Sequence, residues 1–519
     1  MKLTVSKNLV TFFIFLVLLA TGLLFSKQAS AQDQKGDVVY ATNYGNFFTK
    51  GGDPASHVAG EGSLIATTVF EGLVDYGKNL ELLPSLAESW KIAPDWSYID
   101  YFIKKGVKFH NGDPLTAEDV KFSFAKLMDP KMHMVLGVDY RKRIKDVEVI
   151  SPYQARFHLN MPAPDIWKRL WWDGAIMPKK YREAVGEKEF ADKPIGSGPF
   201  RWLEYKQDQY WKVEALPKHH RKTPEFKTLT FVYVPDNSTR VAMLKAGEVD
   251  IAVLSGAHIP VVKSDPNLTF FQVKHVIGSA ITFLDMAHPD RKSPLLDIKV
   301  RKAVSLAIDR ETICNKLLFG SATPWGEVLC PYNLGFDPTV KPDPYDPEQA
   351  KALLAEAGYA NGFETELNTT APGKLTMEAF AANLADVGIK TKINVFEGGA
   401  WYAAHRGKKL TGIKIGGLWY DAEPHPGADI QNSFNSEAPW VYATDEKVEN
   451  LIDESMAATT KEQEAEYGRR LSKMIREMYL RPPLWSQHAN YGLSKKIVKW
   501  EPQAGSYPGT RFEYMQIKP

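Results

Sequence analysis

Short strand-like runs alternate with helical patterns along almost the whole chain, and this alternation constrains the fold more than any other feature. Residue patterns typical of β-strands occur at 37–44, 97–103, 155–160, 227–234, 280–286, 391–397 and 411–420. Apolar residues recur at helical spacing in 63–74, 117–128, 238–247, 298–308 and 346–358. A longer charged helix is predicted from Asp445 to about Tyr479. Mixed elements at this spacing predict an α/β or α+β protein, and its 519 residues suggest two or three domains.

The N-terminus has the pattern of a secretory signal. Lys2 and Lys7 precede an apolar run from Leu9 to Phe25, and Ala29-Ser30-Ala31 follows as the small-x-small sequence that a signal peptidase cuts. We therefore expect a signal peptide over residues 1–31, cleaved after about Ala31. The apolar run has 17 residues, which is near the lower limit for a membrane span, so an uncleaved anchor is the alternative.

Charge and cysteine content narrow the functional classes. Residues 1–31 carry three Lys and no acid, which leaves 61 basic and 62 acidic residues in the rest of the chain. That balance gives no reason to expect nucleic acid or an anionic membrane as partner. After export, Cys314 and Cys330 either form one disulfide or remain as two buried free thiols. A single Cys pair of this spacing is not a zinc pattern, and no metal site is expected.

The stretch KFHNGDPLTAEDVKFSF, residues 108–124, concentrates polar side chains that resemble a catalytic or metal site. Asn111-Gly112 and Asp113-Pro114 are turn signals, and Thr116 with Asp119 forms the pattern of a helix capping box. His110 is expected to point outward from a strand. We therefore interpret the stretch as scaffold. In IGSGPF, Gly196 and Gly198 are interpreted as a tight turn, because no helix follows them to bind phosphate.

Six motifs occur together in one order along the chain: VFEGLVDY (69–76), the segment 80–124, IGSGPFRWLEY (195–205), STRVAMLKAGEVDIA (238–252), SPLLDIKVRKAVSLAIDRETI (293–313) and DPEQAKALLAEAGY (346–359). Because it contains these motifs in this order, the chain resembles the extracellular solute-binding proteins of family 5. These are the dipeptide-, oligopeptide- and nickel-binding receptors of ABC importers. The resemblance extends from about Val38 to the end of the chain.

The resemblance implies an α/β, bilobed periplasmic-binding-protein fold of type II, with a family-specific subdomain and a ligand cleft between lobes that close by hinge motion. Lobe I would comprise residues 32–60, 194–275 and 488–519, with its subdomain at 61–193, and lobe II residues 276–487. The implied function is that of a periplasmic receptor, expected to be a monomer without cofactor. It would deliver a small peptide or peptide-like solute to the permease subunits of an ABC importer.

The resemblance also places the candidate ligand site in the segment 416–434. Peptide-binding relatives carry there an acid that binds the α-ammonium of the peptide, and Asp421 is similar to that acid. Trp419 and Tyr420 would wall a side-chain pocket, and Glu423 and His425 would add polar contacts. The remaining candidates are Asn43, Tyr44, Trp401, Arg406 and Asp285.

Other interpretations remain open at these positions. Trp419 can be a core residue, Arg406 a solvated helix residue, and Asp421 with Glu423 and His425 a weak metal pattern. An oligosaccharide, an opine-like compound or chelated nickel are alternative ligands. A secreted hydrolase is the distant alternative, because the sequence contains no Gly-x-Ser-x-Gly or His-Glu-x-x-His and Ser197 has no evident partner. We predict that the protein is not an enzyme.

Overall fold

The computed structural model describes residues 34, 36–43, 51–56, 67–77, 81–130, 137–163, 166–167, 170, 174–418, 425–436, 440–458, 460–502 and 511–518, without the side chains of 137–139, 406 and 432. Among these residues no helix has both the length and the apolar character needed to cross a membrane.

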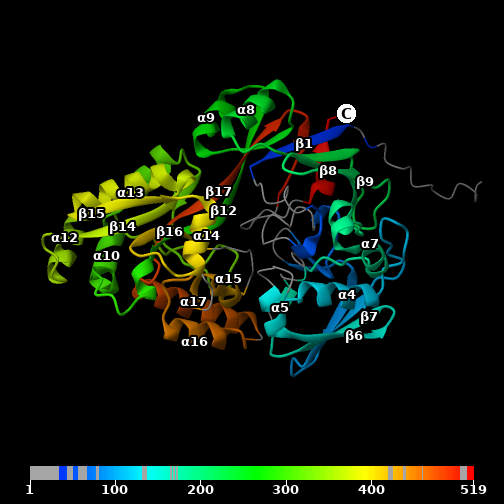
Figure 1. The fold of residues 1–519 in the computed structure, drawn as a ribbon, viewed down its shortest axis with the longest axis horizontal. Coiled ribbons are helices and arrows are strands. Elements are labelled where there is room, and N and C mark those ends of the chain that lie inside the picture. Colours follow the sequence, from blue (N-terminus) through cyan, green and yellow to red (C-terminus); the bar gives the residue numbers. More distant parts are fainter. Residues whose placement is uncertain are drawn as a thin grey trace, which may run out of the picture.

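One mixed sheet runs through the molecule (Figure 1). In spatial order its strands are β15 (Ile389–Phe396), β14 (Phe363–Thr370), β16 (Ile413–Leu418), β12 (Leu268–Phe283), β17 (Pro483–Ser494), β11 (Ile251–Val253), β1 (Asp37–Thr42), β10 (Thr228–Tyr233), β9 (Tyr210–Ala215) and β8 (Phe200–Lys206), and β13 (Ala322–Pro324) pairs with β17. β1 is parallel to β10 and β11, and β14 is parallel to β15 and β16. This mixed α/β architecture confirms the predicted class.

The long antiparallel strands β12 and β17 join the two halves of the sheet. Their register shifts between Val273 and Ile277, so that β12 contains a bulge at this point. Within the bulge His275 has a φ of 58°, a left-handed conformation that is uncommon for a residue other than glycine. The bulge lies beside the predicted lobe boundary at 275/276, and the boundaries themselves stay a prediction.

A second sheet belongs to the half that contains β1. It is antiparallel, with the order β4 (Ala87–Ile92), β5 (Tyr98–Ile103), β7 (Gln154–Leu159) and β6 (Ile144–Ser151). Helix α4 (Ala117–Leu127) packs on it and begins with the predicted capping box, in which the Thr116 backbone N–H donates to Asp119 Oδ2 at 2.9 Å. Val120, Phe124 and Leu127 are buried, as the apolar spacing predicts. Two short antiparallel pairs complete this half, β2 (Val74–Tyr76) with β3 (Leu82–Pro84) and β18 (Ile497–Lys499) with β19 (Gln516–Ile517).

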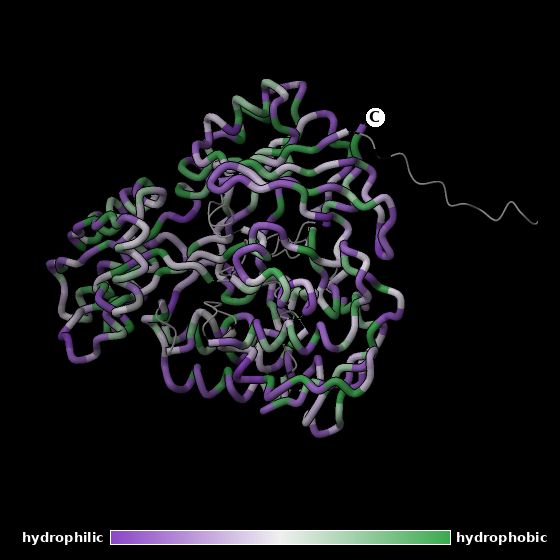
Figure 2. The backbone as a smooth tube through the Cα atoms, turned by 45° about the vertical axis from the view of Figure 1, so that its right-hand side comes forward, coloured by the Kyte–Doolittle hydropathy of each residue, from purple (hydrophilic) through white to green (hydrophobic). Residues whose placement is uncertain are grey.

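Helices pack around both halves of the molecule (Figure 1). They are α5 (Gly137–Arg143), α7 (Lys179–Asp192), α8 (Asn237–Ala246) and α9 (Ile259–Ser264) in the first half, and α10 (Ile298–Leu306), α12 (Pro347–Glu356), α13 (Lys374–Asp386), α14 (Gly398–Arg406), α15 (Pro426–Phe434), α16 (Glu446–Ser455) and α17 (Lys461–Glu477) in the second. The helices predicted at 238–247, 298–308 and 346–358 are thereby confirmed as α8, α10 and α12. Hydrophilic segments are frequent on the outer helices and turns (Figure 2).

Two predicted helices differ in the structure. The long helix from Asp445 to Tyr479 is two helices, because Thr460 and Gln463 form a new capping box at the start of α17. The break lets α16 and α17 pack against each other and bury Leu451 and Leu471 in one core, which a single straight helix does not allow. The helix predicted at 63–74 does not continue to its predicted C-terminal end, because the chain there is extended and strand β2 begins.

The two cysteines are free and buried. Cys314 belongs to a core with α10, α12 and α13, whereas Cys330 belongs to a different core with α15, α16 and α17. The alternative of two buried thiols therefore holds, and burial raises the pKa of Cys314 to about 12.

Candidate ligand cleft

A cavity of about 480 Å³ lies beside β17, where segments from both halves of the large sheet meet. The loop Leu254–Gly256 after β11 contributes from the first half, and the segments 318–322 and 368–377 contribute from the second. A volume of this size falls in the range of pockets that hold small ligands. The cavity is therefore the candidate ligand cleft.

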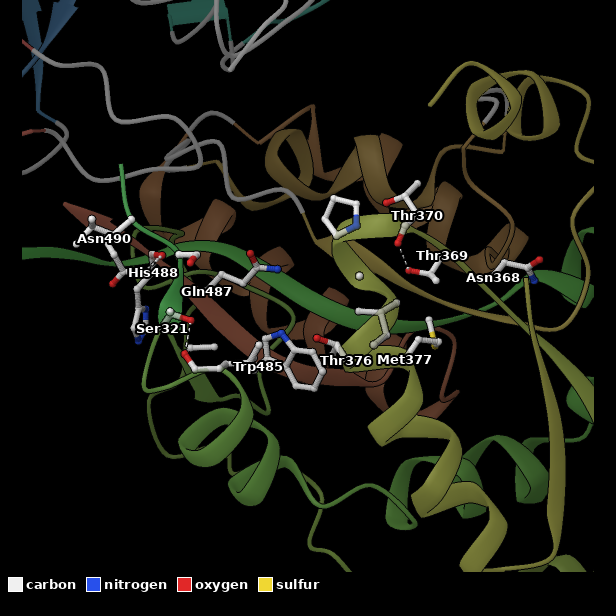
Figure 3. A pocket seen from close by; sticks show the side chains of 18 of the residues that line it. Ser321, Asn368, Thr369, Thr370, Thr376, Met377, Trp485, Gln487, His488 and Asn490 are labelled. Atoms are coloured by element: carbon white, nitrogen blue, oxygen red, sulfur yellow. Dashed lines mark hydrogen bonds between the residues drawn. The ribbon is translucent and has the colours of Figure 1, made fainter. Parts of the chain in front are cut away.

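Polar side chains from the end of β14 form one wall of the cleft (Figure 3). Asn368, Thr369 and Thr370 follow one another there, because β14 ends at the same edge of the sheet as its parallel neighbours β15 and β16. The amide of Asn368 is fixed, since its Nδ2 donates to the carbonyl oxygen of Thr411 at 2.6 Å. This wall is uncharged and offers hydroxyl, amide and backbone groups.

Strand β17 supplies the opposite part of the wall with Trp485, Gln487, His488 and Asn490 (Figure 3). The ring of His488 is fixed at both nitrogens: Nδ1 accepts from the backbone N–H of His275 at 3.2 Å, and Nε2 lies 2.8 Å from Thr323 Oγ1. Burial and the neighbouring His275 lower the pKa of His488 to about 4. His488 is therefore a neutral wall residue that connects the cleft to the bulge of β12.

Trp401 forms an aromatic wall and is one of the residues that the sequence predicts for the ligand site. It lies on α14, where its ring packs on His405 with the centroids 4.2 Å apart. Behind it, Lys414 Nζ lies 2.6 Å from His405 Nε2 and 5.8 Å from the centroid of the Trp401 ring. The neighbouring Ile415 faces the cleft, because successive side chains of a strand point to opposite faces.

The other predicted ligand residues have different positions. Asn43 is exposed directly after β1 and is not part of the cavity wall. Asp285 is buried, and its carboxylate accepts from the Gly412 N–H at 2.9 Å and from the Ser293 hydroxyl at 2.5 Å. His425 caps α15: its Nδ1 accepts from the Ala428 N–H at 3.1 Å and its Nε2 lies 3.0 Å from the carbonyl oxygen of Ser455.

Arg406 is the last residue of α14, and its side chain lies outside the described residues. Trp419, Tyr420, Asp421, Glu423 and Tyr44 also lie outside them. The structure thus brings Trp401 to the cleft, and gives Asp285 and His425 hydrogen bonds within their own half.

Sequence reasoning missed most of the cavity wall. No strand was expected at 483–494, because Gly, Asn, Ser and His interrupt the β-branched pattern there. The polar run Asn368-Thr369-Thr370 before Ala371-Pro372-Gly373 was the available signal, since ligand-binding groups concentrate where strands end in loops.

The stretch at 108–124 is scaffold, as its turn and capping signals predict, but His110 does not point outward. Its ring holds the glycine-rich turn: Nε2 lies 2.9 Å from the Gly198 carbonyl oxygen, and Nδ1 accepts from the Gly196 N–H at 3.3 Å. The two glycines are required by close approach, since a Cβ at Gly196 would meet the Val69 carbonyl oxygen at 2.0 Å. The stretch therefore positions backbone segments, and none of its residues lines the cavity.

Glu71, His219 and His220 form the one His and carboxylate group within the described residues that has the composition of a metal site. Glu71 is nevertheless already paired, because Arg221 Nη1 lies 3.1 Å and the Ser197 hydroxyl 3.0 Å from its carboxylate oxygens. Both ring nitrogens of His219 are also engaged, with the Ser197 carbonyl oxygen and the Arg221 N–H. A cation at this place would meet a guanidinium, so the group is a buried charge network and we assign no metal to it.

Comparison with known structures defines the class of the fold. The structure of the periplasmic binding protein DppA from Helicobacter pylori in complex with the peptide STSA superposes with a TM-score of 0.80, covering 94% of this chain and 99% of that one at 22% identity. HbpA2 from Haemophilus parasuis superposes with a TM-score of 0.79 over 93% of this chain. The fold is thus the bilobed α/β fold of periplasmic binding proteins, as expected.

Comparison of sequences then gives the family. The model of the bacterial extracellular solute-binding proteins, family 5, matches residues 81–438. The chain belongs to this family. Among curated proteins it is similar to heme-binding protein A of Haemophilus influenzae (29% identity, 76% of this chain and 78% of that protein) and to the dipeptide-binding protein of Escherichia coli strain K12 (30% identity, 62% of this chain and 64% of that protein).

Proposed function

We propose that this protein is the substrate-binding receptor of an ABC importer and that it binds a small peptide or peptide-like solute in the interlobe cleft. The observation that carries the proposal is the cavity beside β17 in a chain of this family, with amide, hydroxyl and tryptophan groups in its wall. Such groups suit a ligand that has alternating hydrogen-bonding and apolar parts, as a peptide does. The relatives named as dipeptide- and glutathione-binding proteins support the same class of ligand.

The proposed chemistry is binding followed by release, without a covalent step. Ser197 does not form a serine–histidine pair: its hydroxyl donates to the Glu71 carboxylate, and His219 Nε2 contacts the Ser197 carbonyl oxygen and not the hydroxyl. Closure of the lobes about the β12 bulge would remove the ligand from water and strengthen each polar contact. Delivery to the permease subunits, export to the periplasm with cleavage after about Ala31, and a monomeric state belong to this proposal.

In this proposal Asp421 accepts the α-ammonium group of the ligand. Trp419, Tyr420 and Glu423 complete the wall on the same segment, Trp401 forms the wall of α14, and Tyr44 and Asn43 contribute from the first half. A carboxylate in a cleft that closes pairs strongly with a cationic group, because water no longer screens the pair. His425 and Asp285 would act indirectly, by holding α15 and the end of β12 in place.

Native mass spectrometry of the purified, exported protein, before and after mild unfolding, tests the proposal. A set of released masses that match short peptides is the expected result. One discrete non-peptide mass, such as a heme, an opine, an oligosaccharide or a nickel chelate, would contradict the peptide ligand. Isothermal titration with the peptides so identified then measures the affinity.

A further inference from the structure

Two buried cations on β16 and before β17 lack a carboxylate partner within the described structure. Lys414 is 6% exposed, and its nearest partner is His405. Arg481 is also 6% exposed, and it donates to the carbonyl oxygens of Ser433 at 3.0 Å and Gly417 at 2.7 Å. Buried charges are normally paired, because transfer of an isolated charge from water is costly.

His405 does not neutralise Lys414. Its Nδ1 lies 2.9 Å from the Trp401 carbonyl oxygen and so carries the proton, which leaves Nε2 to accept from the Lys414 ammonium. Burial and the charge of Lys414 lower the pKa of His405 to about 4, and burial and the charge of Arg481 lower the pKa of Lys414 to about 7. The ammonium also donates to the Trp440 carbonyl oxygen at 3.4 Å, and the ring centroids of Trp401 and Tyr442 lie 5.8 and 5.4 Å from it.

The polar groups around the two cations converge on one place. Lys414 pairs across the strands with Thr282, and a Cβ on Gly416 would lie 2.6 Å from Thr282 Oγ1, 2.9 Å from Arg481 Nη2 and 3.6 Å from Lys414 Cε. Because Gly416 has no side chain, these three side chains approach one another closely at this point of β16.

Donors at this place lack acceptors. In the described part of the structure Arg481 Nε and Thr282 Oγ1 are buried without a hydrogen-bond partner, and so is Ser433 Oγ, on the residue whose carbonyl oxygen accepts from Arg481. All three groups carry a hydrogen atom to donate, and each unpaired buried group costs free energy. A group that brings several acceptor atoms and a negative charge would satisfy the whole set.

We propose that Lys414, Arg481, Thr282 and Ser433 form an oxyanion site that takes a carboxylate, behind the Trp401 wall of the cleft. Trp401 connects the two places, because it lines the cavity and its ring contacts the Lys414 side chain. The carboxylate comes either from the ligand itself or from a free small anion. The first source rests on the proposed function, and the second does not.

The test compares a peptide identified by mass spectrometry with its C-terminal amide, by isothermal titration. Wild type is expected to bind the free acid roughly 30-fold more tightly, the effect of one buried charge pair, and Lys414→Met should abolish this preference. Thr282→Val is a second, nearly isosteric variant that removes one donor, and it should reduce the preference by a smaller factor. Lys409→Met, at an exposed lysine five residues away, is the matched control and should retain the full preference.

A second arm detects a free anion without any peptide. The melting temperature of ligand-free protein is measured in sodium acetate and in sodium chloride of equal ionic strength. Stabilisation by acetate in wild type but not in Lys414→Met supports the oxyanion site with a free carboxylate as occupant. If acetate has no specific effect and the acid and amide bind equally to wild type, the proposal is overturned. If no peptide binds at all, the proposed function fails and the acetate arm alone decides the site.

Discussion

Arg221 and Glu71 lie 150 positions apart in the chain, yet Arg221 Nη1 is 3.1 Å from Glu71 Oε1. Glu71 is completely buried, and Arg221 also donates through Nε to Glu513 at 2.9 Å. The network therefore ties the segment before β2, the loop before β10 and the C-terminal segment into one unit. Burial would raise the pKa of Glu71, but hydrogen bonds from His219 and His220 and the charge of Arg221 together lower it well below its usual value.

We predict that Glu71→Gln destabilises the fold by about 3 kcal/mol, because Arg221 loses part of its counter-charge in a buried place. Since the folded pKa of Glu71 is depressed, its contribution is present above the unfolded pKa of about 4.3 and is lost as pH falls below it. Urea unfolding at pH 7 and pH 4 measures both effects.

Glu187→Gln is the matched control for the network, because Glu187 pairs with Lys126 on the surface at 3.2 Å. An exposed pair contributes about 0.5 kcal/mol or less. Equal effects of the two substitutions would show that the Glu71 network adds no more than a surface ion pair.

His110 gives a second, pH-dependent prediction. Burial lowers the pKa of His110 to about 4, whereas in the unfolded chain it is about 6.5. The unfolded state therefore binds the proton first, and stability is lost as pH falls from about 6.5 towards 4. His110→Ala should cost about 1–3 kcal/mol at pH 7, because two backbone groups lose their partner, and should show a smaller loss of stability over that pH range.

Ligand affinity of His110→Ala should equal that of wild type when measured on folded protein, since His110 does not line the cleft. Urea unfolding across pH 4–7 and calorimetric titration provide the two measurements. A variant that folds normally but loses ligand or metal would return the stretch 108–124 to the list of functional sites.

The sequence pattern predicted those helices and strands whose secondary structure is determined by their own residues. The strand at 391–397 and the helix at 117–128 appear as β15 and α4 within two residues, because side-chain period and capping residues act locally. The break between α16 and α17 was not anticipated, since it depends on which core the two helices share. The full length of β12 was also missed: its first half contains Gln272, which pairs with Asn490 of β17, and Lys274 and His275, which lie in the bulge.

In the candidate site, too, the sequence predicted a residue from its local context and missed residues whose role depends on distant contacts. Trp401 was predicted from its place before the signature segment and lines the cleft. Lys414 was not singled out, because its significance arises from burial beside His405 and Arg481, and no local pattern reports such burial. His488 was missed for a similar reason, since its role depends on the distant residues Thr323 and His275.

Trp401 supports a prediction with a neighbouring control. Trp401→Ala should weaken ligand binding by about 2 kcal/mol, because a large aromatic side chain in the wall of a closing cleft acts as an anchor. Tyr402, the next residue of α14, is 63% exposed and does not line the cavity, so Tyr402→Ala should leave the affinity unchanged. Calorimetry with one identified ligand measures both, and equal affinities of the two variants would remove Trp401 from the binding surface.

Asp421 supports the prediction that bears most directly on the class of ligand. Asp421→Ala should weaken binding of an amine-bearing ligand by about 2 kcal/mol or more, the effect of removing one partner of a desolvated ion pair. Asp421→Asn keeps the shape and removes the charge, so it should lose nearly as much affinity. N-acetylation of the same peptide provides the reciprocal change, and wild type should then have no advantage in affinity over Asp421→Asn. Unchanged affinity of Asp421→Ala for the unmodified peptide would exclude Asp421 as the ammonium acceptor and leave the recognition of the ligand to the neutral wall formed by β14 and β17.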